Sequence, residues 1–99
     1  KIAKQPQSWL GIDVAETNSR EGMRYGVQDI KGVVVLKIAV DSPAQGLLTE
    51  GDVIVELGGE EIRNTEEFKK MADELKNRKK AIPFWVIREG RRTFIPIRP

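Results

Sequence analysis

The chain has 99 residues, 39% hydrophobic and 32% charged, which fits one globular domain and excludes both a disordered chain and a second full-size domain. Seventeen basic against fifteen acidic residues leave a net charge of only +2, so nucleic acid is not an expected partner. Cysteine and histidine are absent, which excludes disulfides, thiolate metal sites and Ser-His-Asp or Cys-His catalysis within this chain.

A Ser-Lys dyad from Ser8, Ser19 or Ser42 stays formally open, but none of these serines lies in a nucleophile-elbow pattern. Each has an ordinary role in a loop or a helix cap. We therefore expect no catalytic residue, no cofactor and no metal site in the chain. Direct membrane insertion is not expected either, because no apolar run approaches the ~20 residues of a membrane span.

The N-terminal residues 1–8 are polar apart from Ile2 and Ala3 and include one proline, which is typical of a linker arriving from an upstream domain. The domain itself is predicted to span residues 9–99. Its first strand is expected within 10–14. The polar stretch 16–22 has no hydrophobic period and predicts a loop.

The middle of the chain predicts a central strand at 33–38, because its nearly unbroken β-branched residues indicate burial on both faces. After it, Asp41-Ser42-Pro43-Ala44 predicts the start of a short helix, since Ser42 can cap free amides and Pro43 suits the first helical position. Gly46 and Gly51 bound that helix. A further strand is predicted at 52–57, followed by a glycine turn and a brief strand at 61–62.

The second half predicts one long helix over Thr65 to Lys76, with Asn64 and Thr65 as possible caps. Its apolar residues recur at helical spacing: Phe68, Met71, Ala72 and Leu75. Two strands then flank a hairpin turn at Glu89-Gly90, at 82–87 and 93–97. Pro96 places the last strand at or near a sheet edge, because proline cannot donate to a strand ladder.

Four segments together resemble the PDZ domains that follow the protease domain of bacterial HtrA-type serine proteases. They are Trp9-Leu10-Gly11-Ile12, Gly32-Val33-Val34-Val35, Asp41-Ser42-Pro43-Ala44 running to Gly51-Asp52-Val53-Ile54, and Val86-Ile87-Arg88-Glu89-Gly90. The resemblance implies a mainly β fold with α: a five- or six-stranded half-open β-barrel or sandwich, capped by one long and one short helix, in the bacterial (permuted) strand order. The chain departs from such domains at 47–48, where a Leu-Leu pair replaces the usual Gly-Leu, and at 77–81, where many relatives carry Pro-Gly.

The resemblance also implies a function. Such domains capture C-terminal or exposed hydrophobic peptide tails by β-strand addition, for substrate recognition or regulation of a serine protease in protein quality control. The implied partners are protein C-termini with an apolar last residue and the protease domain of the same parent chain. The implied compartment is the bacterial periplasm or cell envelope.

The implied site has two parts. The carboxylate-binding loop consists of Leu10, Gly11 and Ile12, whose backbone amides can form an anion nest. The peptide-binding strand and pocket consist of Asp13, Val14, Phe68, Ala72 and Leu75, with the strand edge from Ile12 to Ala15 exposed for an incoming peptide. An isolated Leu-Gly-Ile is usually an ordinary turn, and the helix stripe is equally compatible with a core face, so we expect Met71 in the core and Phe68 shared. Trp9 is expected to pack rather than contact a ligand.

Three alternatives remain at this point. The domain can belong to a membrane-embedded or C-terminal processing protease, or to a non-proteolytic scaffold or secretion apparatus. A basic RNA-binding small barrel would need exposed aromatic residues among Lys and Arg on one strand face. The candidates are Phe84, Trp85 and Phe94, of which strand alternation should bury at least some.

Overall fold

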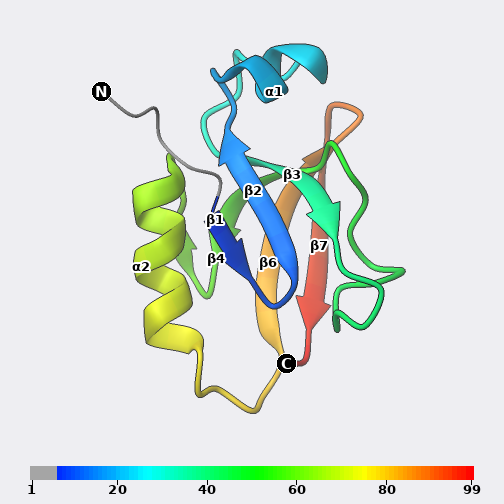
Figure 1. Ribbon diagram of the computed structural model, residues 1–99. Coiled ribbons are helices and arrows are strands. Elements are labelled where there is room, and N and C mark those ends of the chain that lie inside the picture. Colours follow the sequence, from blue (N-terminus) through cyan, green and yellow to red (C-terminus); the bar gives the residue numbers. More distant parts are fainter. Residues whose placement is uncertain (1–6) are drawn as a thin grey trace.

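The computed structural model describes residues 7–99, and its strands form an open antiparallel sheet with one long helix beside it (Figure 1). The elements are β1 (Gln7–Trp9), β2 (Ile12–Glu16), α1 (Arg20–Arg24), β3 (Val33–Ile38), β4 (Val53–Leu57), β5 (Glu60–Glu61), α2 (Thr65–Leu75), β6 (Ile82–Arg88) and β7 (Arg91–Ile97). Six strands follow the order β1-β2-β3-β4-β6-β7, while β5 pairs with β4. The predicted fold class, mainly β with one long and one short helix, is confirmed.

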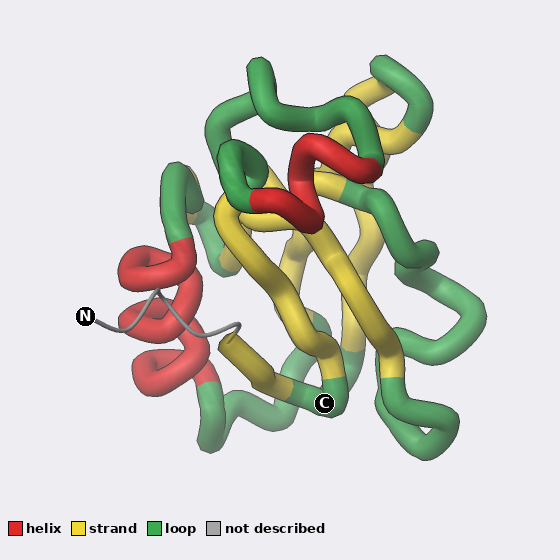
Figure 2. Tube along the Cα trace, turned by 45° about the horizontal axis from the view of Figure 1, so that its top comes forward, coloured by secondary structure: helices red, strands yellow, loops and turns green. Residues whose placement is uncertain are grey.

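The central strand is β3, which lies between β2 and β4. Its residues 33–35 are fully buried, as the unbroken valine run predicts. Val33 and Val35 belong to the main core, whereas Val34 belongs to a second cluster, because successive side chains point to opposite faces. The chain after α1 packs Val27 and Ile30 against that second cluster. Accordingly, α1 and its loops lie across a different part of the sheet from α2 (Figure 2).

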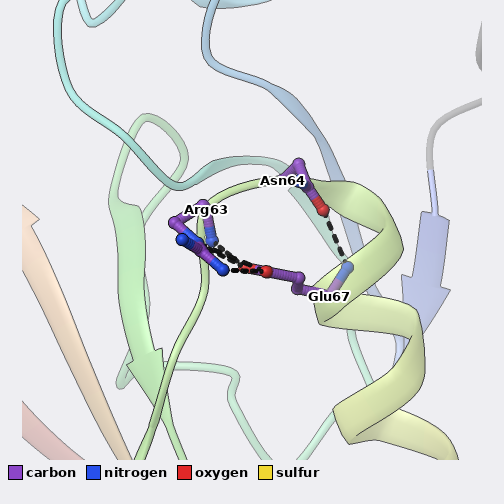
Figure 3. Close-up of polar contacts among 3 residues, drawn as sticks. All are labelled: Arg63, Asn64 and Glu67. Atoms are coloured by element: carbon purple, nitrogen blue, oxygen red, sulfur yellow. Dashed lines mark hydrogen bonds and ion pairs between the residues drawn. The ribbon is translucent and has the colours of Figure 1, made fainter.

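The start of α2 is fixed by hydrogen bonds among Arg63, Asn64 and Glu67 (Figure 3). Asn64 is the N-cap, and its side-chain oxygen accepts a hydrogen bond from the Glu67 amide at 2.9 Å. The Glu67 carboxylate accepts from the Arg63 guanidinium at 2.7 Å and from the Arg63 amide at 2.8 Å. These bonds hold the pKa of Glu67 below its usual range, the guanidinium bond contributing most. One face of α2 is buried: Thr65, Phe68, Met71, Ala72 and Leu75.

The predicted position of the short helix is wrong. Residues 43–47 form turns, although the Ser42 hydroxyl oxygen accepts the Ala44 N–H at 2.9 Å as a cap would. Gly46 has a φ of 84°, in the left-handed region, so the chain leaves helical geometry directly after Pro43 to Gln45. Ser42 therefore makes the hydrogen bond of a helix cap, but too few residues follow it before Gly46 to form a helix.

The short helix is instead α1, within the stretch 16–22 and just beyond it, where the sequence predicts a loop. Ser19 is its N-cap and accepts the Gly22 N–H at 3.2 Å. A side chain at Gly22 would meet the backbone of Thr17, with a Cβ only 1.7 Å from that carbonyl oxygen. This short helix lacks a hydrophobic period and depends on its cap and on a close glycine contact.

The C-terminal hairpin agrees with the sequence. β6 and β7 pair from Ile82↔Ile97 to Arg88↔Arg91, with Glu89 and Gly90 in the turn at φ values of 52° and 79°. Because β7 ends the strand path, Pro96 lies in an edge strand as predicted. The linker predicted over 1–8 stays a prediction: residues 1–6 lie outside the described residues, while Gln7 and Ser8 belong to β1.

A buried carboxylate joins β6 to the loop before β4. Asp52 is 2% exposed and accepts hydrogen bonds from the Arg88 guanidinium at 2.7 and 3.0 Å and from the Thr49 amide at 2.9 Å. Arg88 also donates to the Leu47 carbonyl at 2.9 Å. The hydrogen bond to Asp52 raises the pKa of Arg88 above its usual value.

Replacing Asp52 with Asn should lower the free energy of unfolding by about 2–3 kcal/mol, because it removes a charged partner from a buried bidentate pair. The matched control is Glu56→Gln, which breaks the more exposed pair of Glu56 with Arg92 and should cost less than about 1 kcal/mol. Urea unfolding of both variants measures the difference. Equal losses would contradict the structural weight given to Asp52.

Candidate functional site

The two-residue turn between β1 and β2 has an unusual backbone. Leu10 and Gly11 have φ values of 55° and 73°, and Trp9 pairs with Ile12 on either side of them. Positive φ at both central positions is the geometry of a type I′ hairpin turn. Leucine adopts it at a cost of roughly 1–2 kcal/mol, and strained backbone of this kind is concentrated at functional sites.

The segment 39–42 holds this turn in place. The Ala39 amide donates to the Gly11 carbonyl at 2.8 Å, and the Ser42 hydroxyl donates to the Leu10 carbonyl at 2.6 Å. A Cβ on Gly11 would lie 3.1 Å from the Cβ atoms of both Ala39 and Ser42. Buried Ser42 thus has a structural role, and its bonds favour the cap interpretation over a nucleophile. The contribution of Ala39 could not be predicted from the sequence, because no local pattern indicates it.

The interval between β2 and α2 starts at this turn and is filled by β1, which contacts both elements; this interval is referred to as the groove. At its far end the Glu16 carboxylate accepts hydrogen bonds from the amide and the hydroxyl of Thr65, at 3.1 and 2.7 Å. This contact joins the end of β2 to the start of α2. Beyond it lies a polar pocket whose lining includes Asn18, Lys31 and Arg63. The groove therefore has a fixed turn at one end and a charged, open region at the other.

The structure brings most of the predicted site residues together. Five of them belong to or pack against the main core: Leu10, Ile12, Val14, Phe68 and Leu75. Ala72 is also buried, on the same face of α2 as Phe68. Asp13 alternates with its neighbours on β2 and is only partly buried, so its side chain does not join this apolar group. Only the backbone of Asp13 is suited to a site in the groove.

The strand edge that the sequence predicts to be exposed is occupied. β1 pairs with β2 through Gln7↔Val14, Ser8↔Asp13 and Trp9↔Ile12, and β3 pairs with the other edge of β2. β1 lies between β2 and α2 and contacts both (Figure 1). The expectation of an open edge is therefore wrong for residues 12–14 in this structure. The polar composition before Trp9 predicts a linker, whereas Gln7–Trp9 form a short strand.

Trp9 is the side chain of β1 that enters the groove region. Its ring packs edge-to-face on Phe68 and stacks on Phe84, with centroids 6.0 Å apart in both cases. It remains partly exposed while packing against the main core. The prediction that Trp9 has a packing role is in keeping with these contacts, whereas the contribution of Phe84 was not foreseen.

A second aromatic group lies outside the groove. Trp85 and Phe94 are 5.0 Å apart, and the Arg92 guanidinium lies 4.8 Å from the Trp85 ring. Arg92 is also paired with Glu56 at 2.6 Å, which neutralises its charge. Since Phe84 is buried in the core, Trp85 and Phe94 are the two aromatic candidates left for an RNA-binding face, and the arginine beside them is already paired with a carboxylate.

The described part of the chain gives no sign of a metal centre or of a membrane span. Within residues 7–99 no three side chains of the metal-binding types cluster as ligands would. None of the helices there combines the length and the apolar character needed to cross a bilayer.

Comparison with known proteins identifies the class. The family described as "PDZ domain" matches residues 8–97, and this chain belongs to that family. PDZ domains are non-catalytic modules, so the match agrees with the expectation that the chain is not itself an enzyme.

Within that class, the similarity is to HtrA-type proteases. The chain is 37% identical over 97 residues to a probable periplasmic serine endoprotease DegP-like from Ectopseudomonas mendocina (strain ymp), covering 96% of this chain and 19% of that protein. A protein of the same description from Marinomonas sp. (strain MWYL1) is 31% identical over 97% of the chain and 20% of the relative. The chain thus spans about a fifth of the length of these curated relatives.

Solved structures give the same grouping. The HtrA-type protease AlgW with decapeptide aligns with a TM-score of 0.72 at 27% identity, over 94% of this chain and 29% of that one. The HtrA3 PDZ domain bound to a phage-derived ligand (FGRWV) aligns with a TM-score of 0.70 at 20% identity, over 96% and 86% of the two chains. At 20% identity, the similarity to the HtrA3 PDZ domain shows a shared fold. The resemblance stated from the sequence is confirmed.

Substituting Gly11 with Ala should destabilise the domain more than the same change at Gly59. Both glycines have positive φ, at 73° and 90°, but only Gly11 faces close neighbours, whereas a Cβ at Gly59 meets nothing within 4 Å. Both substitutions carry a backbone cost of about 1 kcal/mol, so the additional loss of stability in the Gly11 variant measures how tightly the turn is packed. We expect an excess of about 1 kcal/mol or more in urea unfolding. Equal losses would show that the contacts with Ala39 and Ser42 relax freely.

Proposed function

We propose that this domain binds peptides that end in a free carboxylate and an apolar residue, such as Val, Leu, Ile or Phe, in the groove between β2 and α2. The observation that carries the proposal is the pairing of β2 with a short antiparallel strand that ends at the Leu10–Gly11 turn. A peptide with its C-terminus at this turn would run in the same direction beside β2. The similar structures of an HtrA3 PDZ domain bound to a phage-derived ligand and of AlgW with a decapeptide support a peptide as the ligand.

In this proposal the peptide carboxylate is bound by the backbone amides of Leu10, Gly11 and Ile12. Successive amides in a tight turn with positive φ form a nest that favours an anion without a charged side chain. The carbonyls of Leu10 and Gly11 are already held by the 39–42 segment, which supports a fixed orientation of the turn. A preorganised turn binds with less loss of conformational entropy than a mobile one.

The last side chain of the peptide would lie against the apolar residues of β2 and α2. The proposed contacts are Leu10, Ile12, Phe68, Ala72 and Leu75. Four of them are buried, and Trp9 packs on Phe68, which supports a site that accepts a large apolar side chain. The upstream peptide backbone would pair with Asp13 and Val14. Burying one such side chain contributes roughly 1.5–3 kcal/mol, so micromolar affinity is the expected scale after ordering costs.

The parent protein is proposed to be a periplasmic serine protease of the HtrA type, in which this module captures substrate tails or regulates the protease domain of the same chain. The names of the curated relatives support both the compartment and the enzyme class. They favour this assignment over a scaffold or a secretion module.

The proposal predicts that amidation of the peptide C-terminus weakens binding by about tenfold or more, because a neutral amide presents donors to the donors of the turn. The probes are FGRWV and three analogues that end in Leu, Ile or Phe, each as the free acid and as the amide. Isothermal titration calorimetry of the domain with each pair measures the ratio.

Two results would contradict the proposal. Equal affinity for acid and amide would indicate a site for internal segments at a sheet edge, without recognition of the C-terminus. Absence of binding by all four free acids at millimolar concentration would exclude this ligand class.

A further inference from the structure

β1 occupies the place that the proposed peptide would take. It runs antiparallel to β2 and reaches the Leu10–Gly11 turn with its C-terminal end, so Trp9 lies opposite Ile12 and Gln7 opposite Val14. A peptide whose carboxylate sits on that turn would present its last residue opposite Ile12. The register of β1 therefore matches that of a ligand, residue by residue.

The side chain of Trp9 completes this match. It packs on Phe68 of α2 at 6.0 Å, against the same face that is proposed to hold the last side chain of a peptide. It also stacks on Phe84 at 6.0 Å with an interplanar angle of 13°. An aromatic side chain at this position excludes any other from the same space.

We infer that β1 is an intramolecular competitor for the groove, so that the domain exchanges between a closed state, in which β1 covers β2, and an open state that accepts a peptide. The inference rests on the proposed function. It follows from the number of edges that β2 has: β3 holds one of them along Ile12–Glu16, and only the other can take either β1 or a peptide. The two occupants exclude each other.

The closed state depends on a strand of only three residues, and so short a strand favours exchange. The three residues of β1 pair with β2 through Gln7↔Val14, Ser8↔Asp13 and Trp9↔Ile12. Its residue Trp9 packs against the main core. A contact that does not involve β1 also joins α2 to β2, through Thr65 and Glu16.

The competition sets the apparent affinity of the domain. The measured dissociation constant equals the intrinsic one divided by the fraction of molecules that are open, so a domain that is open one time in ten binds about tenfold more weakly than its open state. Any event that draws the residues before Leu10 away from the groove would raise the affinity for peptide. The segment that leads into the domain thereby becomes its regulator.

A reversible covalent lock tests the inference. Ser8 and Asp13 are directly opposite in the register, and such residues have Cα atoms about 4.5–5.5 Å apart, within the range that a disulfide spans. Because the chain contains no cysteine, the double variant Ser8→Cys/Asp13→Cys can form one intramolecular disulfide. We expect the oxidised variant to bind the free-acid peptides at least about tenfold more weakly than the same protein after reduction. The single variants should be insensitive to reductant.

Each outcome of this experiment bears on the inference. Equal affinity of the oxidised and reduced forms would overturn it while leaving the proposed function intact. Failure of the disulfide to form would contradict the register and overturn it as well. Absence of binding in the wild type and in the reduced variant would overturn the proposed function and this inference with it.

Trp9 provides a second measurement that needs no cysteine. The variant Trp85→Phe leaves Trp9 as the sole tryptophan, because the chain has only two. We expect its emission to shift to longer wavelength on addition of the free-acid peptide, with the same midpoint as calorimetry, because Trp9 leaves Phe68 and Phe84 for water. Binding heat without any change in emission would place peptide and β1 side by side and refute the competition.

Discussion

The arrangement depends on one tight turn. Leu10 and Gly11 reverse the chain in two residues with positive φ, and hydrogen bonds from Ala39 and Ser42 fix both of their carbonyls. This turn sets the register of β2 against its neighbours and defines where the groove beside α2 ends. A Cβ at Gly11 would have to tolerate both a φ of 73° and a 3.1 Å approach to two neighbours, so glycine is favoured there on two independent grounds.

The same apolar residues serve stability and recognition. Ile12 and Phe68 are fully buried members of the main core, and they also belong to the proposed site, on β2 and α2 respectively. A pocket built from core residues would be costly to leave empty, since exposed apolar surface and voids both destabilise a domain. Trp9 removes that cost in the closed state. In the proposed exchange, ligand binding replaces one apolar side chain with another, which limits the net gain in binding free energy and would suit reversible capture of peptide tails.

The fold could largely be predicted because its signals are local. The valine run of β3, the capped and amphipathic α2 and the Glu89-Gly90 hairpin lie where their patterns place them. The errors arise where tertiary contacts override local patterns. Ser42 has a cap signal but serves the Leu10 turn, and α1 depends on the close approach of Gly22 to Thr17.

The candidate site could be predicted only in part. A family resemblance assigned Leu10 to Val14 and the face of α2, but the polar composition of the segment before Trp9 gave no indication that it pairs with β2. A three-residue strand is too short for a period of two to be recognised. Its presence follows from the open edge of β2 and from the space that Trp9 fills between two phenylalanines.

The most direct test of the central claim is a titration of the ¹⁵N-labelled domain with the free-acid peptide, followed by the chemical shifts of assigned backbone amides. The account predicts that the largest changes fall on Leu10 to Val14 and on α2, with little change along the outer edge of β7. Changes concentrated around Trp85 and Phe94, with Leu10 to Val14 unaffected, would contradict the assignment of the groove between β2 and α2.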